Sequence, residues 1–543
     1  MTTHEVLNQA PPLAGYDVYA ADTALVEGVA REGAGWADAE LRSLGELAGR
    51  PESQALGVAA NAYPPVLHTH DRYGHRVDEV EFHPAWHSVL STAVAHGLHA
   101  SPWRDPRPGA HVARAAAFAV WSQVEAGHGC PIAMTYAAVP ALQATPELAA
   151  QWVPGLTSLD YDFGLRPAAE KRGLLAGMAM TEKQGGSDVR ANTTRAEPGS
   201  DGTWRLTGHK WFCSAPMCDV FLVLAQAPRG LSCFVLPRVL PDGTRNAMHL
   251  QRLKDKLGNK SNASSEIELV GATAWLLGEE GRGVRTIIEM VNYTRLDCVI
   301  GSLAGLRQGV AQATHHAAHR QAFGRYLTDQ PLMQNVLADL AVEAEAATVL
   351  TLRLAAACDR APEDARESAF RRLALAVSKY WVCKRFPSHA VEAMECLGGN
   401  GYVEDSGMPR LYREAPLPSI WEGSGNVNAL DVLRAMGKEP ESVAAFFSIV
   451  EEAGGAEPRV RTAMDEVQRE LADLDGIEVR ARRIVERLAL LLQGALLVSG
   501  GHPAVTEAFL ASRLAGDWGQ AFGTLPRGLD LVTIVERARP KVG

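Results

Sequence analysis

The sequence predicts an α+β protein built from four successive parts: an N-terminal arm with a helical domain, a small β domain, a helical bundle, and an extra helical domain at the C-terminus. The chain has 543 residues, too many for one ordinary hydrophobic core. Its early and late segments repeat apolar residues at helical spacing, whereas a middle segment alternates and contains turn signals. The predicted domain boundaries are 1–172, 173–282, 283–437 and 438–543.

The first part is expected to begin as an arm. Residues 1 to about 50 contain Pro11-Pro12 and several glycines, which favour an extended conformation. From about Trp86 to Ala149 the sequence is rich in alanine. Within it, residues 111–125 repeat apolar side chains at steps of three and four, which predicts a helix.

The composition changes near Gly173, where a small β domain of roughly 100 residues is predicted to begin. Gly199-Ser-Asp-Gly202 and Pro241-Asp-Gly243 are typical turn sequences. Strands are predicted over residues 204–211, 220–225, 231–236 and 265–269.

A long helical pattern returns at Gly283 and predicts a bundle. Its helices are expected over residues 284–318, 331–359, 367–396 and 426–436. The block beyond residue 438 is not needed to complete this helix–β–helix plan. Its apolar run from Leu488 to Ser499 is shorter than the ~18 residues of a membrane span, which predicts a buried helix.

Composition favours a soluble globular protein in the cytoplasm. Hydrophobic residues make up 47% of the chain and charged residues 21%, and the formal net charge is −10, so the surface as a whole repels nucleic acid. No membrane span and no secretory signal are expected. The eight cysteines are scattered without a CxxC pair, and no histidine cluster has metal-ligand spacing. Reduced thiols and no metal site are therefore predicted.

Several short motifs follow one another over about 250 residues. They are Met178–Val189 (MAMTEKQGGSDV), His209–Ser214 (HKWFCS), His319–Gly324 (HRQAFG), Leu397–Tyr402 (LGGNGY) and Ile420–Asn426 (IWEGSGN). Taken alone, the first favours an ordinary surface turn. Together and in this order, they resemble the flavin-binding signatures of the acyl-CoA dehydrogenase family.

The resemblance implies the fold and the cofactor of that family. The fold comprises a helical domain, a small antiparallel β-barrel or sandwich and a four-helix bundle, and the cofactor is FAD. Thr181 and Ser187 match positions that hydrogen-bond the flavin and its phosphate, while Phe212 and Ser214 match positions at the ring. The cofactor-binding residues implied in this way are Met178, Met180, Thr181, Gly186, Ser187, Trp211, Phe212, Cys213, Ser214, Arg320, Phe323, Gly398, Gly399, Ile420, Trp421, Gly423, Ser424 and Asn426.

The same resemblance assigns the chemistry to Glu422, as the base that takes the α-proton of an acyl thioester. Thr294 stands where some members carry the base instead, and a threonine cannot serve. Arg295 is a plausible partner of the carboxylate or the substrate. Without the resemblance, a glutamate at this place is simply a charge favoured at a helix N-terminus. Arg320 matches a family arginine that reaches the pyrophosphate of the flavin in a neighbouring subunit, which implies at least a dimer and usually a homotetramer.

Further segments resemble one branch of the family, which responds to DNA alkylation. They are residues 7–13, 31–36, 82–86, 253–259 and 411–416, together with the extra C-terminal helical domain. This likeness implies weak acyl-CoA dehydrogenase activity, a homotetramer, and binding of double-stranded DNA, with association to the nucleoid, through the extra domain. From Glu441 onward, however, 12 Lys and Arg stand against 15 Asp and Glu.

A local basic stripe is the candidate for DNA binding. Arg480, Arg483 and Arg487 share one helix face and could neutralise a few phosphates. The alternative is a solvated helix face on which Glu478 and Glu486 pair with these arginines.

Three functions therefore remain open. The first in rank is a DNA-associated flavoprotein that protects against alkylation damage and has residual dehydrogenase activity. The others are a metabolic acyl-CoA dehydrogenase without a DNA role, and a flavoprotein oxidase that detoxifies a small molecule.

Overall fold

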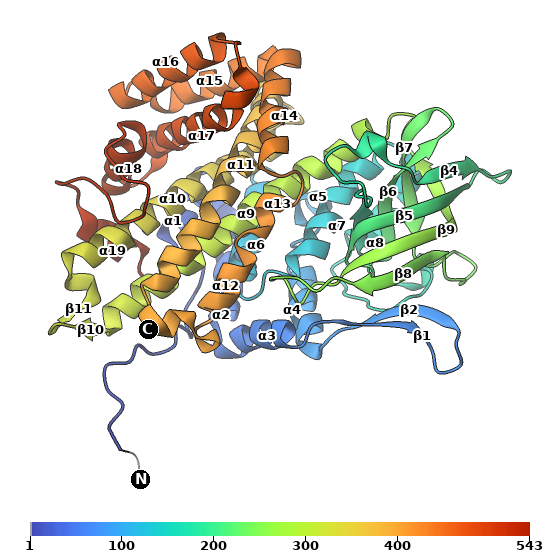
Figure 1. Ribbon diagram of the computed structural model, residues 1–543, viewed down its shortest axis with the longest axis horizontal. Helices are drawn as coiled ribbons and strands as arrows, with labels where there is room; N and C mark the ends of the chain where they lie inside the picture. The colour runs from blue at the N-terminus through green and yellow to red at the C-terminus, as the bar shows by residue number, and fades with distance from the viewer. Residues whose placement is uncertain (1–2, 543) are drawn as a thin grey trace. The chain divides into compact units, whose positions relative to one another are not determined.

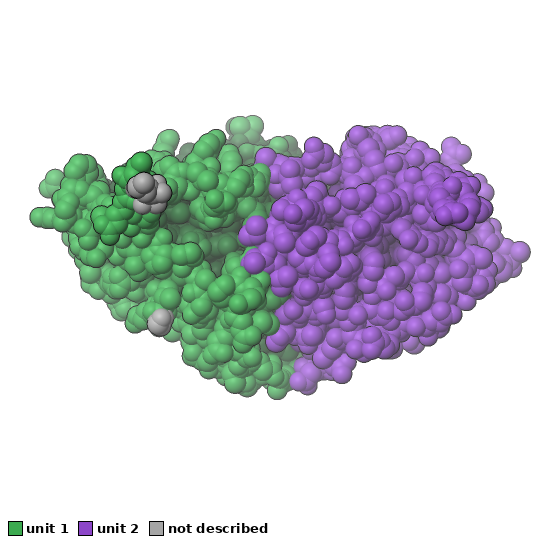
Figure 2. Space-filling view, turned by 90° about the horizontal axis from the view of Figure 1, so that it is seen from below, with its two compact units in different colours: residues 1–54, 107–124, 298–543 green, residues 55–106, 125–297 purple. Residues whose placement is uncertain are grey.

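A computed structural model describes residues 3–542 of the chain (Figure 1). It contains two compact units, which Figure 2 colours separately. Unit 1 comprises Met1–Gln54, Arg107–Val124 and Cys298–Gly543, and unit 2 comprises Ala55–Pro106 and Glu125–Asp297. Helices α3 (Pro51–Ala62) and α9 (Gly283–His319) contribute residues to both.

Unit 2 contains the β domain. Its seven-stranded sheet has the order β3-β6-β4-β5-β9-β7, β8 pairs with β9, and an additional β6–β7 pairing closes five of the strands into a ring. Neighbours are antiparallel except that β6 runs parallel to β3 and β4. The strands are β3 (Ala176–Ala179), β4 (Arg195–Pro198), β5 (Trp204–Ser214), β6 (Val220–Ala227), β7 (Gly230–Pro237), β8 (Met248–Leu253) and β9 (Ser264–Leu277).

The burial of each strand explains whether it could be predicted from the sequence. β6 and β7 are buried almost throughout, so they read as continuous apolar runs, and all four predicted strands are present. β3, β4 and β8 were not predicted, because they are only four to six residues long and lack clear alternation.

Helices complete unit 2, together with an unpredicted antiparallel hairpin of β1 (Val66–His70) and β2 (Arg76–Glu81). The helices are α4 (Pro84–Ala95), α5 (Ser101–Arg104), α7 (Gly129–Leu142), α8 (Pro146–Leu156), η2 (Ala168–Glu170) and η3 (Val189–Ala191).

Unit 1 is almost entirely helical. Three long helices, α9, α10 and α11, correspond to the predicted bundle helices within one to two residues at each end. The elements before the C-terminal block are α1 (Thr23–Arg31), η1 (Gly35–Ala37), α2 (Asp38–Gly49), α6 (Ala110–Ser122), β10 (Gln321–Ala322), β11 (Arg325–Tyr326), η4 (Leu327–Asp329), α10 (Pro331–Arg360), α11 (Ala365–Glu395), η5 (Gly398–Tyr402), η6 (Glu404–Ser406), α12 (Met408–Glu414), α13 (Leu417–Ile420) and α14 (Gly425–Lys438).

The C-terminal helical block packs against the bundle inside unit 1. Helices α15 and α17 contact α11 and each other, and the last helix returns to α10 (Figure 1). The segment 488–499 lies within α17 and is largely buried, as predicted. The elements are α15 (Pro440–Gly454), α16 (Pro458–Ala472), α17 (Ile477–Gly500), α18 (Pro503–Phe509), the π-helical turn η7 (Leu510–Leu514) and α19 (Leu531–Ala538).

The expectation of an extended arm over the first 50 residues is wrong beyond residue 22. Asp22 caps α1 by accepting a hydrogen bond from the Leu25 amide, and α1 and α2 bury apolar side chains such as Leu25, Val29 and Leu44. Of the residues that suggested an arm, Pro11, Pro12 and Gly15 lie ahead of α1, whereas the other glycines lie within or between α1 and α2. The four domain boundaries stay a prediction, because the compact units divide the chain differently.

All eight cysteines are buried free thiols. Within residues 3–542, no helix is both long and apolar enough to cross a membrane.

Candidate functional site

In unit 2, the two motifs nearest the β domain lie side by side. The Trp211 amide on β5 donates to the Thr181 carbonyl at 2.8 Å, and the Lys183 amide donates to His209 Nε2 at 3.0 Å. Met178 belongs to β3, and the side chain of Asn192 fixes the carbonyl of Met180 at 2.9 Å. Residues about thirty positions apart are thus brought to one place.

A buried ion pair fastens this junction. Lys210 Nζ lies 2.8 Å from Glu182 Oε1, and both side chains are fully shielded from water. Glu182 also accepts hydrogen bonds from the amides of Thr193 and Thr194. Burial alone would raise the pKa of Glu182, but these hydrogen bonds and the Lys210 ammonium lower it to about 2. The carboxylate is therefore ionised, and it sits directly next to Thr181 in the chain.

Beside the junction lies an aromatic surface flanked by cations. Phe212 is 48% exposed although it is a large apolar side chain, while Cys213 next to it is buried. Lys254 Nζ lies 3.7 Å from the centre of the Trp211 ring and 4.5 Å from that of Phe212. Lys183 lies 5.7 Å from the Trp211 ring.

The chemistry of this surface fits FAD. A flavin needs donors for its ring nitrogen and carbonyl groups, an apolar wall, and cationic or backbone N–H partners for its pyrophosphate. Within the described part of the chain, the hydroxyls of Thr181, Ser187 and Ser214 have no protein hydrogen-bond partner and remain available to a ligand. At Gly186 a Cβ atom would meet Thr181 Oγ1 at 2.5 Å, so this turn can close only on glycine.

In unit 1, Glu422 lies in the short loop between α13 and α14, next to Trp421 and Gly423. The carboxylate residue is half-buried, and its backbone has φ +55°, in the left-handed region that a residue with a Cβ rarely adopts. Ile420 is 63% exposed, and Ser424 and Asn426 are exposed at the start of α14. The residues of this predicted motif therefore share one partly open loop.

Two buried side chains hold the loop. Lys379 Nζ on α11 donates to the carbonyls of Gly423 at 2.5 Å and Ser419 at 3.4 Å. Asn428 Nδ2 donates to the same Gly423 carbonyl at 2.6 Å and to that of Ser424 at 3.1 Å.

The Arg320 motif lies at a small two-stranded hairpin, β10–β11, of unit 1. Phe323, at its tip, is 99% exposed and has φ +52°. Arg320 donates to the carbonyl of Asn8, and the Asn8 side chain exchanges hydrogen bonds with the backbone of Gln321 at 2.9 and 2.7 Å. The N-terminal segment is thus attached to the hairpin, which the sequence did not predict.

The remaining predicted residues are placed as follows. Gly398 and Gly399 are exposed in η5, where Gly398 has φ +60°. Arg295 is buried on α9 in the part that belongs to unit 2, whereas Glu422 belongs to unit 1.

The predicted basic stripe on α17 is paired with acidic side chains of α16 and the loop after it. Arg483 lies 3.1 Å from Glu470, Arg487 lies 2.8 Å from Glu470, and Arg480 lies 3.2 Å from Asp473. The pairing partners differ from Glu478 and Glu486, which the sequence suggested on the same helix.

Sequence reasoning missed Glu182, Lys210, Lys254 and Lys379. A signal existed for Lys210, because it occupies an inward position of an alternating strand where only a paired charge is tolerated. Lys379 likewise interrupts the apolar run from Leu373 to Cys383. Neither pattern identifies the partner, which lies elsewhere in the chain.

Three family models match the chain in succession. The Adaptive response protein AidB N-terminal domain matches residues 8–163, the Acyl-CoA dehydrogenase middle domain matches 177–271, and the Acyl-CoA dehydrogenase C-terminal domain matches 281–437. These ranges include every motif on which the flavin-site residues depend.

Relatives of similar length support the same assignment. The putative acyl-CoA dehydrogenase AidB of Escherichia coli (strain K12) is 48% identical over 93% of this chain and 94% of its own. Acyl-CoA dehydrogenase family member 11 of Caenorhabditis elegans is 31% identical over 82% of this chain and 78% of its own. The crystal structure of Caenorhabditis elegans ACDH-11 in complex with C11-CoA matches with a TM-score of 0.85 and 28% identity, covering 96% of both chains. The chain therefore belongs to the acyl-CoA dehydrogenase family of FAD-dependent oxidoreductases, and it carries the N-terminal domain of AidB.

Proposed function

We propose that the protein oxidises an acyl-CoA thioester, with Glu422 as the base that takes the α-proton. The observation that carries this proposal is the conformation of Glu422, which is half-buried and has a backbone φ of +55°. Lys379 and Asn428 hold its loop by donating hydrogen bonds to the Gly423 carbonyl. Backbone strain of this kind persists where the surroundings over-determine it, and it is concentrated at functional sites. A fixed carboxylate within reach of the substrate is the arrangement that general-base catalysis requires.

Each unit carries residues that would contact FAD. In unit 2, Thr181, Ser187 and Ser214 would donate hydrogen bonds, Trp211 and Phe212 would supply the apolar wall, and Lys254 would add positive charge. In unit 1, the glycines of η5 and the exposed start of α14 would contact the remainder of the dinucleotide, and Arg320 would reach the pyrophosphate of a flavin in a neighbouring subunit. When bound, FAD supplies the acceptor for the hydride that leaves the β-carbon of the substrate.

In this reaction the side chains of the protein would carry out the abstraction of one proton. A carboxylate oxygen of Glu422 would receive it from the α-carbon of the acyl group, and Arg295 remains the proposed partner of the carboxylate or of the substrate. The related Caenorhabditis elegans protein was crystallised in complex with C11-CoA, which supports a CoA thioester of medium acyl length as the first substrate to try.

The test is anaerobic bleaching of the flavin absorbance. Purified protein is saturated with FAD and mixed with C11-CoA and with shorter and branched acyl-CoAs. We expect bleaching by at least one of them, and we expect Glu422→Gln to bind FAD normally but to lose the bleaching. Dithionite reduction of the same sample is the control that the bound flavin is redox-active. The proposal fails if no acyl-CoA bleaches a flavin that dithionite reduces. Rapid reoxidation in air with formation of peroxide would instead favour an oxidase.

We propose further that the active form is a homotetramer. Its support is a set of apolar side chains that unit 1 exposes around the Arg320 hairpin, namely Phe323 at 99%, Leu332 at 84% and Tyr402 at 82% exposure. Side chains of this size are costly to leave in water, and clustering around one motif is typical of an interface.

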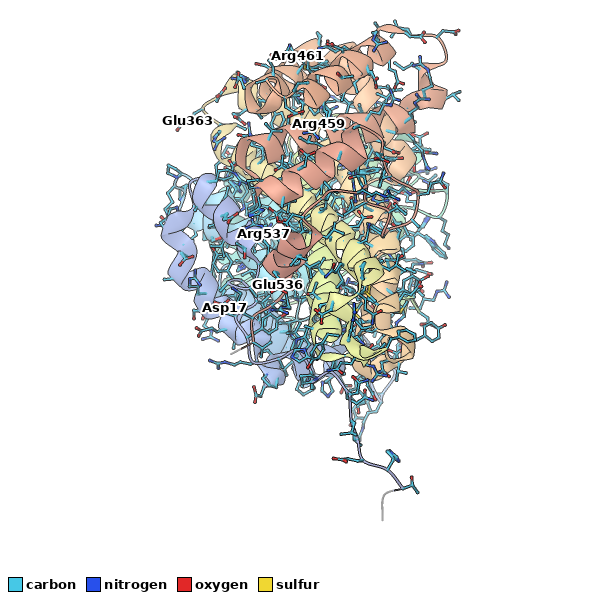
Figure 3. All side chains as sticks on the ribbon, turned by 90° about the vertical axis from the view of Figure 1, so that its left-hand side faces the viewer. Asp17, Glu363, Arg459, Arg461, Glu536 and Arg537 are labelled. Atoms are coloured by element: carbon cyan, nitrogen blue, oxygen red, sulfur yellow. The ribbon has the colours of Figure 1, made fainter. Side chains whose placement is uncertain are left out.

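We also propose a role in the response to DNA alkylation that includes binding of duplex DNA. The support is the match to the AidB N-terminal domain and the 48% identity to E. coli AidB. The proposed DNA residues Arg480, Arg483 and Arg487 carry acidic partners, so phosphates would have to displace Glu466, Glu470 and Asp473. Other arginines of the block are paired too. Figure 3 labels Arg459 and Arg461, which lie 2.8 Å from Glu507 and 3.0 Å from Glu451.

Fluorescence anisotropy with a labelled duplex at several salt concentrations tests DNA binding. We expect affinity to fall steeply with salt, since released counterions drive such binding. The combined replacement of Arg480, Arg483 and Arg487 by Met should weaken binding and leave FAD bound, whereas Arg461→Met serves as the control away from the stripe. Unchanged affinity in the triple variant would reject these three residues as the DNA contact.

We place the protein in the cytoplasm. The support is the set of eight cysteines, all of which are buried and reduced.

A further inference from the structure

Lys379, a buried lysine on α11 next to the Glu422 loop, has no part in the reaction described above. Lys379 is 1% exposed, yet its ammonium donates to the Gly423 carbonyl of this loop and to the Ser419 carbonyl within α13. Across residues 3–542, no Asp or Glu oxygen lies within ion-pair distance of it. The charge of the side chain is therefore directed at backbone carbonyls of α13 and of the loop that follows it.

The loop needs to be held, because its conformation is unfavourable by itself. A residue other than glycine is strained in the left-handed region and stays there only when its surroundings hold it. Glu422 adopts this conformation, and Gly423 after it has φ +100°. If the loop relaxed, the direction of the Glu422 side chain would change with its backbone.

The Gly423 carbonyl is the point at which the loop is fixed. It accepts from Lys379 at 2.5 Å and from Asn428 at 2.6 Å, so both of its lone pairs are used. Lys379 approaches from α11, and Asn428 lies within the first turns of α14. One carbonyl thus connects the bundle, the loop and the helix that follows Glu422.

Stability alone does not explain a lysine at this position. Its neighbours on α11, including Leu375, Val382 and Cys383, are buried. Burying an ammonium costs several kcal/mol before any contact repays it, and an apolar side chain of similar size would avoid this cost. The lysine instead contacts the Gly423 carbonyl of the Glu422 loop at 2.5 Å and, at 3.4 Å, the Ser419 carbonyl of α13, which leads into the loop.

We infer that Lys379 is a positioning residue for the proton transfer assigned to Glu422. It acts on the carboxylate through the backbone of Gly423 and Ser419 and does not itself touch the substrate. This inference rests on the proposed function, so the test has one measurement that needs no turnover.

The first measurement is hydrogen exchange of the full-length, FAD-loaded protein. We expect Lys379→Met to speed exchange of the amides of residues 421–428 by about tenfold or more, because the hold on the loop is lost. Ser378→Ala is the matched control: Ser378 is the preceding residue of α11, it is also buried, and its hydroxyl bonds only to Ala374 within the helix. Asn428→Ala removes the second donor to Gly423 and should have the same effect as Lys379→Met.

The second measurement is the limiting rate constant of flavin bleaching by C11-CoA. We expect Lys379→Met to lower it by at least about tenfold, because small displacements of a reacting group are costly. The dissociation constants of FAD and of C11-CoA should change by less than about threefold. If the role of Lys379 were merely structural, the substitution would change the dissociation constants along with the rate constant, or would change neither. It would also change the melting temperature.

The outcomes separate the two ideas. If the wild type is not bleached by any acyl-CoA, the proposed function fails, and hydrogen exchange still decides whether Lys379 holds the loop. Unchanged exchange in both Lys379→Met and Asn428→Ala overturns the inference, and so does faster exchange with a wild-type rate of bleaching. If Lys379→Met does not fold, Asn428→Ala decides both measurements.

Discussion

At the scale of single residues, the buried pair of Glu182 and Lys210 organises the flavin side of unit 2. Each member is adjacent in the chain to a proposed flavin contact, Thr181 or Trp211, and the two contacts are themselves joined by a backbone hydrogen bond. Such a pair is weak evidence for stability in itself, but removing one partner leaves the other charged and buried. The pair should therefore matter more to the geometry of the site than to its net stability.

We predict that Lys210→Met lowers the free energy of unfolding by about 3–5 kcal/mol, because Glu182 keeps its charge without its cation. The double variant Glu182→Gln with Lys210→Met should lose less, since no unpaired charge remains. Urea unfolding with tryptophan fluorescence measures both. A double variant less stable than Lys210→Met would contradict this explanation.

The same carboxylate should make stability depend on acid pH. The folded pKa of Glu182 is about 2, below the ordinary value of 4.5, so its contribution is present above about pH 4.5 and is lost as the pH falls towards 2. The contribution of Glu182 ionisation to the free energy of unfolding is about 3 kcal/mol at neutral pH and less than about half of that at pH 3. The stability difference between the wild type and Glu182→Gln should shrink accordingly, whereas Glu197→Gln, at an exposed strand position, should show no such trend.

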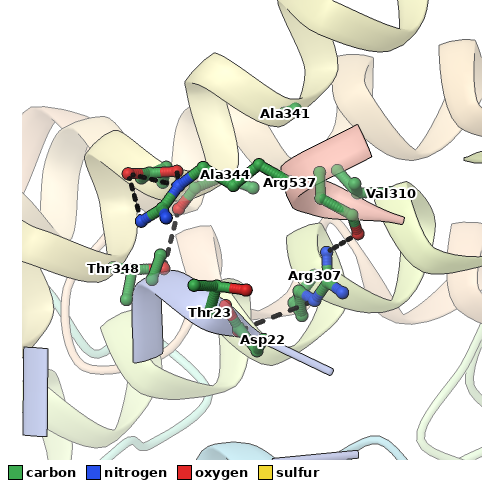
Figure 4. A pocket seen from close by; sticks show the side chains of 11 residues that line it. Asp22, Thr23, Arg307, Val310, Ala341, Ala344, Thr348 and Arg537 are labelled. Carbon is green, nitrogen blue, oxygen red and sulfur yellow. Dashed lines mark hydrogen bonds and ion pairs between the residues drawn. The ribbon is translucent and has the colours of Figure 1, made fainter. Parts of the chain in front are cut away.

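At the scale of elements, the last helix ties the two ends of unit 1 to the bundle. Arg537 on α19 contacts Glu27 on α1 at 2.5 Å and Glu345 on α10 at 2.9 Å. Nearby, Arg307 on α9 donates to the Ala538 and Ala21 carbonyls, each at 2.7 Å. Arg307, Glu345 and Arg537 line a cavity of about 20 Å³, together with Asp22 and Thr348 (Figure 4). The charged groups are thus concentrated where the C-terminal helix meets α1 and α10.

We predict that Arg537→Ala destabilises unit 1 by about 2–3 kcal/mol, because Glu345 is left largely buried without its cation. The C-terminal segment should also become sensitive to limited proteolysis at low protease concentration. Arg539→Ala is the matched control: Arg539, directly after α19, is more exposed and pairs with Glu536 of that helix, so its loss should cost less than about 1 kcal/mol. Equal effects of the two variants would argue against this role of α19.

At the scale of the whole molecule, the exposed hairpin around Arg320 is the association surface that we propose. Phe323 and Leu332 are almost fully exposed and make little contribution to the folded chain, so their substitution should leave folding intact. Substituting them should therefore weaken the association of subunits and leave the stability of the single chain unchanged.

We predict that the double variant Phe323→Ser with Leu332→Ser dissociates the oligomer into smaller species and weakens FAD binding, with a melting temperature measured on dilute protein close to that of the wild type. Analytical ultracentrifugation across a range of concentrations measures the assembly. Val479→Ser, on the equally exposed Val479 of α17, is the control. An unchanged oligomer in the double variant would remove this hairpin from the interface.

The sequence by itself determined the family, the fold class, the four main strands and the long bundle helices. These follow from local patterns: α10 and α11 repeat apolar residues over some thirty positions, and β6 and β7 are mainly apolar runs between turns. It also placed Thr181, Trp211, Glu422 and Arg320 in motifs, because each motif is contiguous in the chain.

Only the tertiary structure decided which groups act on those motifs. Glu182 meets Lys210 across 28 positions, Lys379 reaches Gly423 across 44, and Arg480 and Arg483 meet acidic residues of α16 and its following loop. Packing forces each of these charges to find a partner, because an unpaired charge in the interior costs several kcal/mol, but the partner is chosen by the fold and not by the neighbouring sequence. The same reason explains why α1 forms where an extended arm was expected. Its apolar residues favour a helix because the bundle buries them, and the local sequence does not show that burial.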